Sequence, residues 1–173
     1  MIKQELTTTS VFQEKYRSMS KEEIIEQYGQ DYDTFFMTLK LIPPGKFSEK
    51  FLNGWGIKEI TAHIASWNLE TIKGNQAVVD GGIPWFFDDE EKINNYNTKE
   101  IERKKKATLE NNLQEIEITH NRLIKFLEKF PSNLFHQSFG KTWKGQEVTP
   151  SLVCSYRHYL HHTQDIIRWL EQE

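Results

Sequence analysis

The stretch Ser20–Leu39, SKEEIIEQYGQDYDTFFMTL, contains both a helix start and a helical pattern. Ser20 and Glu23 have the spacing of a capping box, in which each side chain bonds the backbone N–H of the other residue. Apolar residues then recur mostly in steps of three and four, at Ile24, Ile25, Tyr28, Tyr32, Phe35, Phe36 and Leu39. This spacing predicts an amphipathic helix, which ends before Pro43 and Pro44.

Three further helices are expected along the chain. One follows Gly56 and extends to about residue 80, with an apolar stripe at Ile57, Ile60, Ile64 and Trp67. The next extends from about residue 98 to 130. The last begins at Thr149–Pro150, a capping residue followed by proline, and runs to the C-terminus. Residues 83–97 are expected to form an aromatic and acidic connection. No pair of alternating runs predicts a sheet, so the fold class is all-α, a four-helix bundle.

The length of 173 residues fits one domain, assigned to residues 20–173, with residues 1–19 as an N-terminal extension. The 22 basic and 25 acidic residues give a net charge of −3, which offers no overall attraction to nucleic acid. The basic run Arg103–Lys106 is interpreted as the solvated face of a helix. A nucleic-acid partner is therefore considered unlikely.

The chain has no signal-like N-terminus and no apolar run near the roughly 20 residues that span a bilayer. Cys154 is its single cysteine, so no internal disulfide is possible. These features predict a cytoplasmic protein with no membrane partner.

Two histidines are spaced to share one side of a helix. His158 and His162 are four residues apart, so both rings project from the same face, one turn apart. Two imidazoles at this spacing can bind one metal ion. His63 lies beside the apolar stripe of another helix, where it could supply a third nitrogen and leave one coordination position open. The spacing is equally compatible with packed or surface histidines.

Asp165 follows on the same helical stripe. Its carboxylate could orient a ligand imidazole, ligate directly or lie at the edge of the stripe in solvent. His161 points about 100° away from His162, which favours a supporting or structural role. His120 is interpreted as a packed histidine. Four tryptophans could wall an apolar pocket, although aromatic residues at helical spacing are usually core: Trp55, Trp67, Trp85 and Trp143.

Two segments together resemble the DinB/YfiT-like superfamily. Trp55–Asn68, WGIKEITAHIASWN, is similar to the second helix of that family, and His158–Ile166, HYLHHTQDI, to its fourth. The resemblance implies a four-helix bundle, a divalent metal such as zinc or nickel, and often a homodimer. It maps the metal ligands of the family onto His63, His158 and His162. Asp165 stands where many members have glutamine.

Other features are more similar to the ClbS/DfsB-like subgroup, including the Ser20–Glu23 start and the Pro84–Phe86 loop. The superfamily resemblance implies a metal-dependent thiol S-transferase or hydrolase acting on a small electrophilic metabolite, with a low-molecular-weight thiol as a possible partner. Asp165 or His161 would then handle protons. The subgroup resemblance implies a metal-independent self-protection protein that opens a strained ring such as a cyclopropane. A non-catalytic protein that binds a small molecule or metal is the third alternative.

Overall fold

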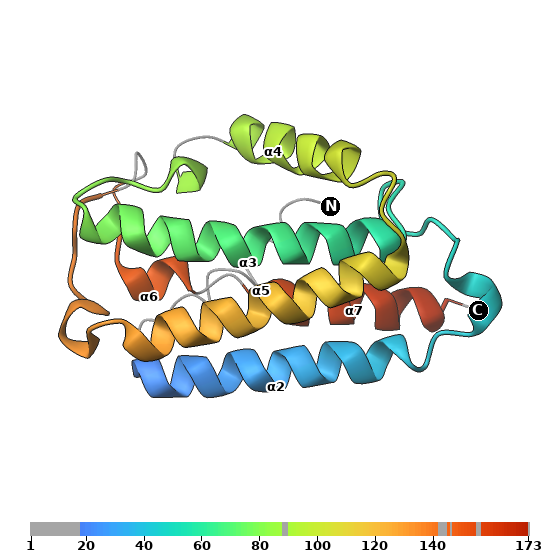
Figure 1. Cartoon of the computed structure of the whole chain (residues 1–173), viewed down its shortest axis with the longest axis horizontal. Coiled ribbons are helices and arrows are strands. Elements are labelled where there is room, and N and C mark those ends of the chain that lie inside the picture. The colour runs from blue at the N-terminus through green and yellow to red at the C-terminus, as the bar shows by residue number, and fades with distance from the viewer. Residues whose placement is uncertain (1–17, 88–89, 142–144, 146, 155–156, 173) are drawn as a thin grey trace.

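Four helices form the bundle in the computed structural model, which describes residues 18–87, 90–141, 145, 147–154 and 157–172. They are α2 (Lys21–Leu39), α3 (Ile57–Val79), α5 (Leu109–Lys129) and α7 (His158–Leu170). Both α2 and α3 pack against α5 and α7, which closes a ring of four helices around one core (Figure 1). The predicted all-α bundle is therefore confirmed.

Shorter elements complete the described chain. The helix α4 (Glu90–Arg103) lies outside the ring along α3, and α6 (Pro150–Val153) precedes α7 (Figure 1). Single 3-10 turns occur at Pro44–Lys46, Trp85–Phe87 and Ser132–Leu134. Within the described ranges, β-type pairing is limited to two isolated bridges, Leu52 with Trp55 and Lys141 with Glu147. No helix of this part of the chain is long and apolar enough to cross a membrane.

The local signals at the helix starts are confirmed. The Ser20 hydroxyl accepts from the Glu23 N–H at 3.1 Å, and the Ser20 N–H donates to the Glu23 carboxylate at 2.7 Å. At α6, the Thr149 hydroxyl accepts from the Leu152 N–H at 3.0 Å, with Pro150 at the first helical position. These side chains satisfy backbone donors that have no partner inside the helix.

The prediction of one helix over residues 98–130 is wrong, because the chain breaks between α4 and α5. Thr108 caps α5 through Asn111, whose backbone N–H donates to the Thr108 hydroxyl at 3.1 Å. Lys104 lies buried in the break, where its ammonium donates to the Ala62 carbonyl at 3.2 Å and pairs with Glu115 at 2.8 Å. The basic run is therefore not wholly a solvated face.

The prediction of one continuous helix from residue 150 to the C-terminus is also wrong. The helix α6 ends at Val153, and α7 begins at His158. The Tyr28 hydroxyl donates to the Cys154 carbonyl at 3.0 Å, so this carbonyl has a partner outside the helix. Arg157, just before α7, pairs with buried Asp31 of α2, and its Nε donates at 2.6 Å. Contacts with α2 thus hold the chain at this break between the two helices.

Residues 1–17 lie outside the described ranges, so the predicted N-terminal extension stays a prediction. The same holds for the structural role of Trp143.

The apolar core of the ring is continuous and includes Phe35, Ile60, Leu123 and Ile166, all essentially inaccessible to solvent. A smaller apolar cluster joins α3 to the Trp85–Phe87 turn and α6, and it contains Trp67, Phe86 and Leu152. The histidine site described next lies beside Trp67.

Candidate functional site

The structure brings the three predicted histidines together between α3 and α7. The ring centroid of His63 lies 5.2 Å from that of His158 and 5.2 Å from that of His162. His158 and His162 occupy successive turns at the start of α7, which is why both reach the same residue of α3. His63 and His162 are buried, with 7% and 9% of their surface exposed.

Aromatic side chains surround this cluster. Trp67, one turn after His63 on α3, stacks on the His158 ring with centroids 5.1 Å apart and planes inclined by 21°. Trp55 lies against His63 at 5.1 Å, and Trp85 contacts Trp67 at 6.0 Å. Three of the four tryptophans expected to wall an apolar pocket therefore gather at the histidines. Their rings keep the imidazoles in a largely apolar environment.

This environment keeps two of the imidazoles neutral. Burial, together with the neighbouring His162 and His158 rings, holds the pKa of His63 well below its usual 6.5. Burial and the nearby His162 and His161 lower the pKa of His158 to about 3. At neutral pH both rings therefore carry an unprotonated nitrogen. That protonation state is the one that a metal ion requires of histidine.

Asp165 is placed to orient His162. Its carboxylate lies 3.0 Å from Nδ1 of His162 and also accepts from the Arg168 guanidinium at 2.6 Å. Burial would raise the pKa of the Asp165 carboxyl, but the contacts with His162 and Arg168 lower it overall. A carboxylate on one ring nitrogen fixes the tautomer and leaves the other nitrogen for a ligand. This arrangement corresponds to the orienting role among those considered for Asp165.

The donor set fits a divalent metal in type, and the spacings of His63 from His158 and from His162 match those of rings that share an ion. With Zn–N bonds of about 2 Å and roughly tetrahedral angles, two ligand ring centroids lie about 5 Å apart. The Nδ1 atom of His63 is buried and has no hydrogen-bond partner, which is costly unless a ligand satisfies it. As the side chains stand, however, no group of three or more His, Cys, Asp or Glu in the described ranges is arranged to hold an ion. The imidazoles would therefore have to turn to bind one.

His161 and His120 are not part of this cluster. His161 is exposed on α7, outside the cluster. His120 of α5 is buried and stacks on Tyr32 at 4.2 Å, which matches its interpretation as a packed residue. Cys154 is fully buried, and burial raises the pKa of its thiol to about 12, so it is not a thiolate at neutral pH.

Sequence analysis missed the contribution of α4. Its Asn97 accepts from the Trp67 indole N–H at 2.8 Å, and its Glu100 accepts from the Ser66 hydroxyl at 2.9 Å. Tyr96 packs against Trp67 at 5.5 Å. No residue of α4 is fully buried, so its attachment to α3 combines these polar contacts with the packing of half-buried Ile93 and Tyr96. Its apolar residues are few, Ile93, Tyr96 and Ile101, and the polar residues between them gave no signal that the segment would reach the site.

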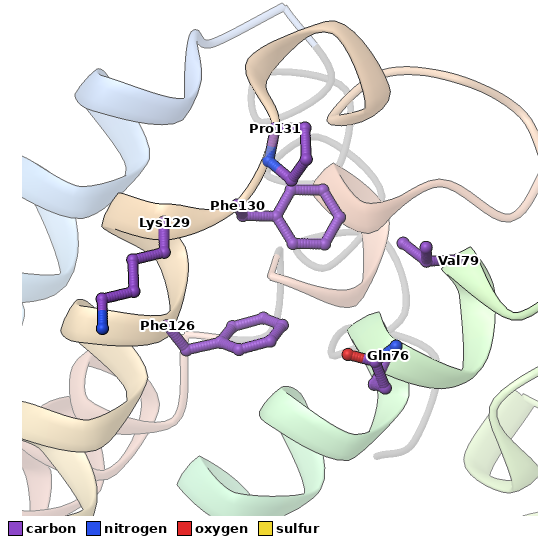
Figure 2. A pocket seen from close by; sticks show the side chains of 6 residues that line it. All are labelled: Gln76, Val79, Phe126, Lys129, Phe130 and Pro131. Carbon is purple, nitrogen blue, oxygen red and sulfur yellow. The ribbon is translucent and has the colours of Figure 1, made fainter.

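A separate hollow of about 220 Å³ lies at the far end of α3 and α5. Figure 2 shows Phe126 and Phe130 of this hollow turned toward the α3 side chains Gln76 and Val79. Its remaining lining residues are Lys129 and Pro131. Gln76 is 13 residues from His63, or about 20 Å along a helix, so this hollow is not part of the histidine site.

Comparisons with known proteins identify the fold. No family model and no curated protein sequence matches the chain. Among solved structures, the colibactin self-resistance protein ClbS, in complex with double-stranded DNA, superimposes with a TM-score of 0.70 at 15% identity. The match covers 88% of this chain and 96% of ClbS. An uncharacterised protein from Escherichia coli UTI89 matches with a TM-score of 0.70 at 14% identity, over 88% of this chain and 94% of that protein. The chain therefore has a ClbS-like helical fold.

Proposed function

We propose that the chain binds a divalent metal, zinc or nickel, through His63, His158 and His162 and uses it to act on a small electrophilic metabolite. The observation that carries this proposal is the 5.2 Å spacing of the His63 ring from both rings of α7. The low pKa values of His63 and His158 support it, because neutral imidazoles are ready ligands. The unpartnered Nδ1 of His63 supports it further.

Three imidazoles leave a coordination position at which a metal can lower the pKa of a thiol or a water molecule. A thiolate would attack an electrophilic carbon, forming a C–S bond as the bond to the leaving group breaks. Hydrolysis would form a C–O bond in the same way, and the proton released from water would pass to a base. We assign Asp165 to orientation of His162, because its carboxylate contacts that ring directly. His161 remains a predicted proton carrier, exposed beside the site.

The test compares two buried histidines. Zinc and nickel are titrated into the full, untagged chain, its His63→Gln variant and its His120→Gln variant, after circular dichroism confirms that all three are folded. We expect one equivalent bound by the wild type and by His120→Gln, and at least about a hundredfold weaker binding by His63→Gln. Absence of stoichiometric binding by the folded wild type would overturn the proposal.

Consumption of a model electrophile with a low-molecular-weight thiol then separates the reactions. Thiol loss matched by product identifies transfer, whereas electrophile loss without thiol loss identifies hydrolysis. A single stoichiometric event without turnover identifies a sequestering protein. Light scattering tests the predicted homodimer in the same preparations.

A second candidate function is metal-independent self-protection, favoured by the superposition on ClbS over 88% of this chain. In this case water would add across a strained ring, with one C–O bond formed, one C–C bond broken and a proton delivered to carbon. Turnover of an activated cyclopropane by chelator-treated protein would support it. Because ClbS was solved with double-stranded DNA, duplex binding by this chain is measured alongside, at low and physiological salt.

A further inference from the structure

The hollow at the ends of α3 and α5 presents apolar side chains at the surface of the bundle. The rings of Phe126 and Phe130 lie 5.7 Å apart, centroid to centroid, and Phe126 and Val79 are only half-buried. At about 220 Å³ the hollow is smaller than the roughly 300–1,000 Å³ of most small-molecule pockets. Its size and its lining therefore fit one or two apolar side chains of a protein better than a metabolite.

The described chain begins at the rim of this hollow. The side chain of Lys21, the first residue of α2, is buried, and its ammonium donates to the carbonyls of Glu128 and Phe130 at 3.2 and 3.0 Å. These carbonyls lie at the end of α5, where they have no partner inside the helix. Figure 1 shows the start of α2 and the ends of α3 and α5 together at one end of the bundle. The N-terminal extension is therefore attached next to the hollow.

The sequence of this extension supplies aromatic side chains with a helical spacing. Residues 10–17 read SVFQEKYR, in which Phe12 and Tyr16 are four positions apart and so share one helix face. Ser10 and Gln13 have the spacing of a capping box, which predicts a helix start at Ser10. Six residues span at most about 20 Å when extended and about 9 Å in a helix, so both rings can reach the hollow.

We propose that residues 10–17 fold back onto this end of the bundle and place the rings of Phe12 and Tyr16 in the hollow. The two rings would contact Phe126 and Phe130 there, and apolar surface of both partners would leave water. Tethering favours this occupant over a separate partner, because a short linker gives an effective concentration of about millimolar. The extension then belongs to the folded unit. This inference is independent of the metal chemistry proposed above.

The first test measures proximity in the full chain by nuclear magnetic resonance. Lys125→Cys carries a spin label on α5 beside Phe126, and the control Lys106→Cys carries the label before the opposite end of α5. Cys154 is fully buried and its thiol is neutral, so the label reacts with the introduced cysteine. We expect the label on Lys125→Cys to broaden the amide signals of residues 10–17, and the label on Lys106→Cys to leave them sharp. Sharp signals in both labelled proteins would overturn the proposal.

The second test changes each side of the contact separately. Phe12→Ala removes a ring from the extension, and Gln76→Lys places a charge in the hollow at an exposed position. Their matched controls are Gln4→Ala and Gln30→Lys, the latter at an exposed position of α2. Hydrogen exchange in the amides of residues 10–17 should accelerate at least about tenfold in the first two variants and remain unchanged in the controls. The double variant should exchange no faster than either single one. Equal rates in the wild type and all the variants would contradict docking in the hollow.

Mixing then distinguishes the extension of the same chain from that of a second copy. Protein labelled with ¹⁵N and carrying no spin label is mixed with unlabelled Lys125→Cys protein that carries the spin label. Broadening of residues 10–17 in this mixture would show that the extension docks on another copy, and would overturn the proposed occupant. Sharp signals in the mixture, with broadening when both labels are on one chain, would support it.

Discussion

The two helices that flank His63 are attached to the bundle in different ways. The helix α7 contributes His158 and His162 and is fixed by a buried ion pair and by apolar packing of residues such as Tyr159 and Ile166. The helix α4 contributes Asn97 but has no fully buried residue, and it is held to α3 by side-chain hydrogen bonds and by half-buried Ile93 and Tyr96. Buried apolar area and satisfied buried charges resist local opening, whereas a few polar contacts do not. We therefore expect α4 to open locally more readily than α7.

The largest expected effect comes from the ion pair that secures α7. Asp31 and Arg157 have only 8% and 14% of their side-chain surface exposed, so removing one partner leaves a buried charge unpaired. We expect Arg157→Leu to lower the free energy of unfolding by about 3–5 kcal/mol, measured by denaturant titration. The matched control is Arg168→Leu, whose arginine is 65% exposed beside Asp165. Arg168→Leu should lower the free energy of unfolding by about 1 kcal/mol or less.

The double variant Asp31→Leu with Arg157→Leu sharpens this test. Because it removes both charges, its loss should be smaller than the sum of the two single losses. If Arg157→Leu costs no more than Arg168→Leu, α7 is not secured by this pair. The distinction between the two helices would then rest on apolar packing alone.

The local sequence was sufficient to predict helix starts that depend on neighbouring residues. Ser20 with Glu23 and Thr149 with Pro150 are such cases. The break before α7 could not be predicted in this way, because the Tyr28 hydroxyl that bonds the Cys154 carbonyl is 126 residues away in sequence. The start of α5 does have a local signal, because Thr108 caps the helix through Asn111, whereas the contact of Lys104 with Ala62, 42 residues away, could not be read from the local sequence.

The candidate site shows the same division. The spacing of His158 and His162 predicts that they share a helix face, and the place of His63 beside an apolar stripe made it the expected third donor, which the family resemblance also implied. The structure brings these rings together, whereas metal binding itself stays a prediction. Asn97 was not predictable, because an amide in a polar helix carries no periodic signal until the fold places it on Trp67.

An intermediate effect is expected on acidification, through His120 at the α5–α7 contact. Its ring packs edge-on against Tyr159 of α7 at 5.6 Å, and burial lowers its pKa to about 4 from the usual 6.5. Between these values the unfolded chain binds the proton and the folded chain does not, so stability is lost as pH falls below 6.5. At pH 5 this histidine alone should lower the free energy of unfolding by about 2 kcal/mol relative to pH 7.

The measurement compares the wild type with His120→Gln by denaturant titration at pH 7 and pH 5. Other buried histidines contribute with the same sign, so the difference between the two proteins isolates His120. The variant should lose less stability on acidification than the wild type by about 2 kcal/mol. Equal losses would show that protonation of His120 is not resisted by the α5–α7 contact.

The smallest effect on global stability, and the most specific to α4, is expected from Ser66→Ala. The Ser66 hydroxyl bonds Glu100 at 2.9 Å, and Glu100 keeps its Arg103 partner when that contact is lost. The free energy of unfolding, measured by denaturant titration, should therefore fall by about 1 kcal/mol or less. Native-state hydrogen exchange, in contrast, should accelerate in the amides of α4 and remain unchanged in α7.

The control for this comparison is Thr98→Ala. Among the bonds described, the Thr98 hydroxyl donates only to the Asn94 carbonyl, which belongs to the same helix. This variant should leave the attachment to α3 intact and the exchange of α4 nearly at the wild-type rate. If the amides of α4 exchange as slowly as those of α7 in the wild type, α4 does not open locally. If Ser66→Ala accelerates exchange in both helices equally, α4 opens only when the bundle unfolds. The contacts of α4 then resist opening as strongly as the buried ion pair does.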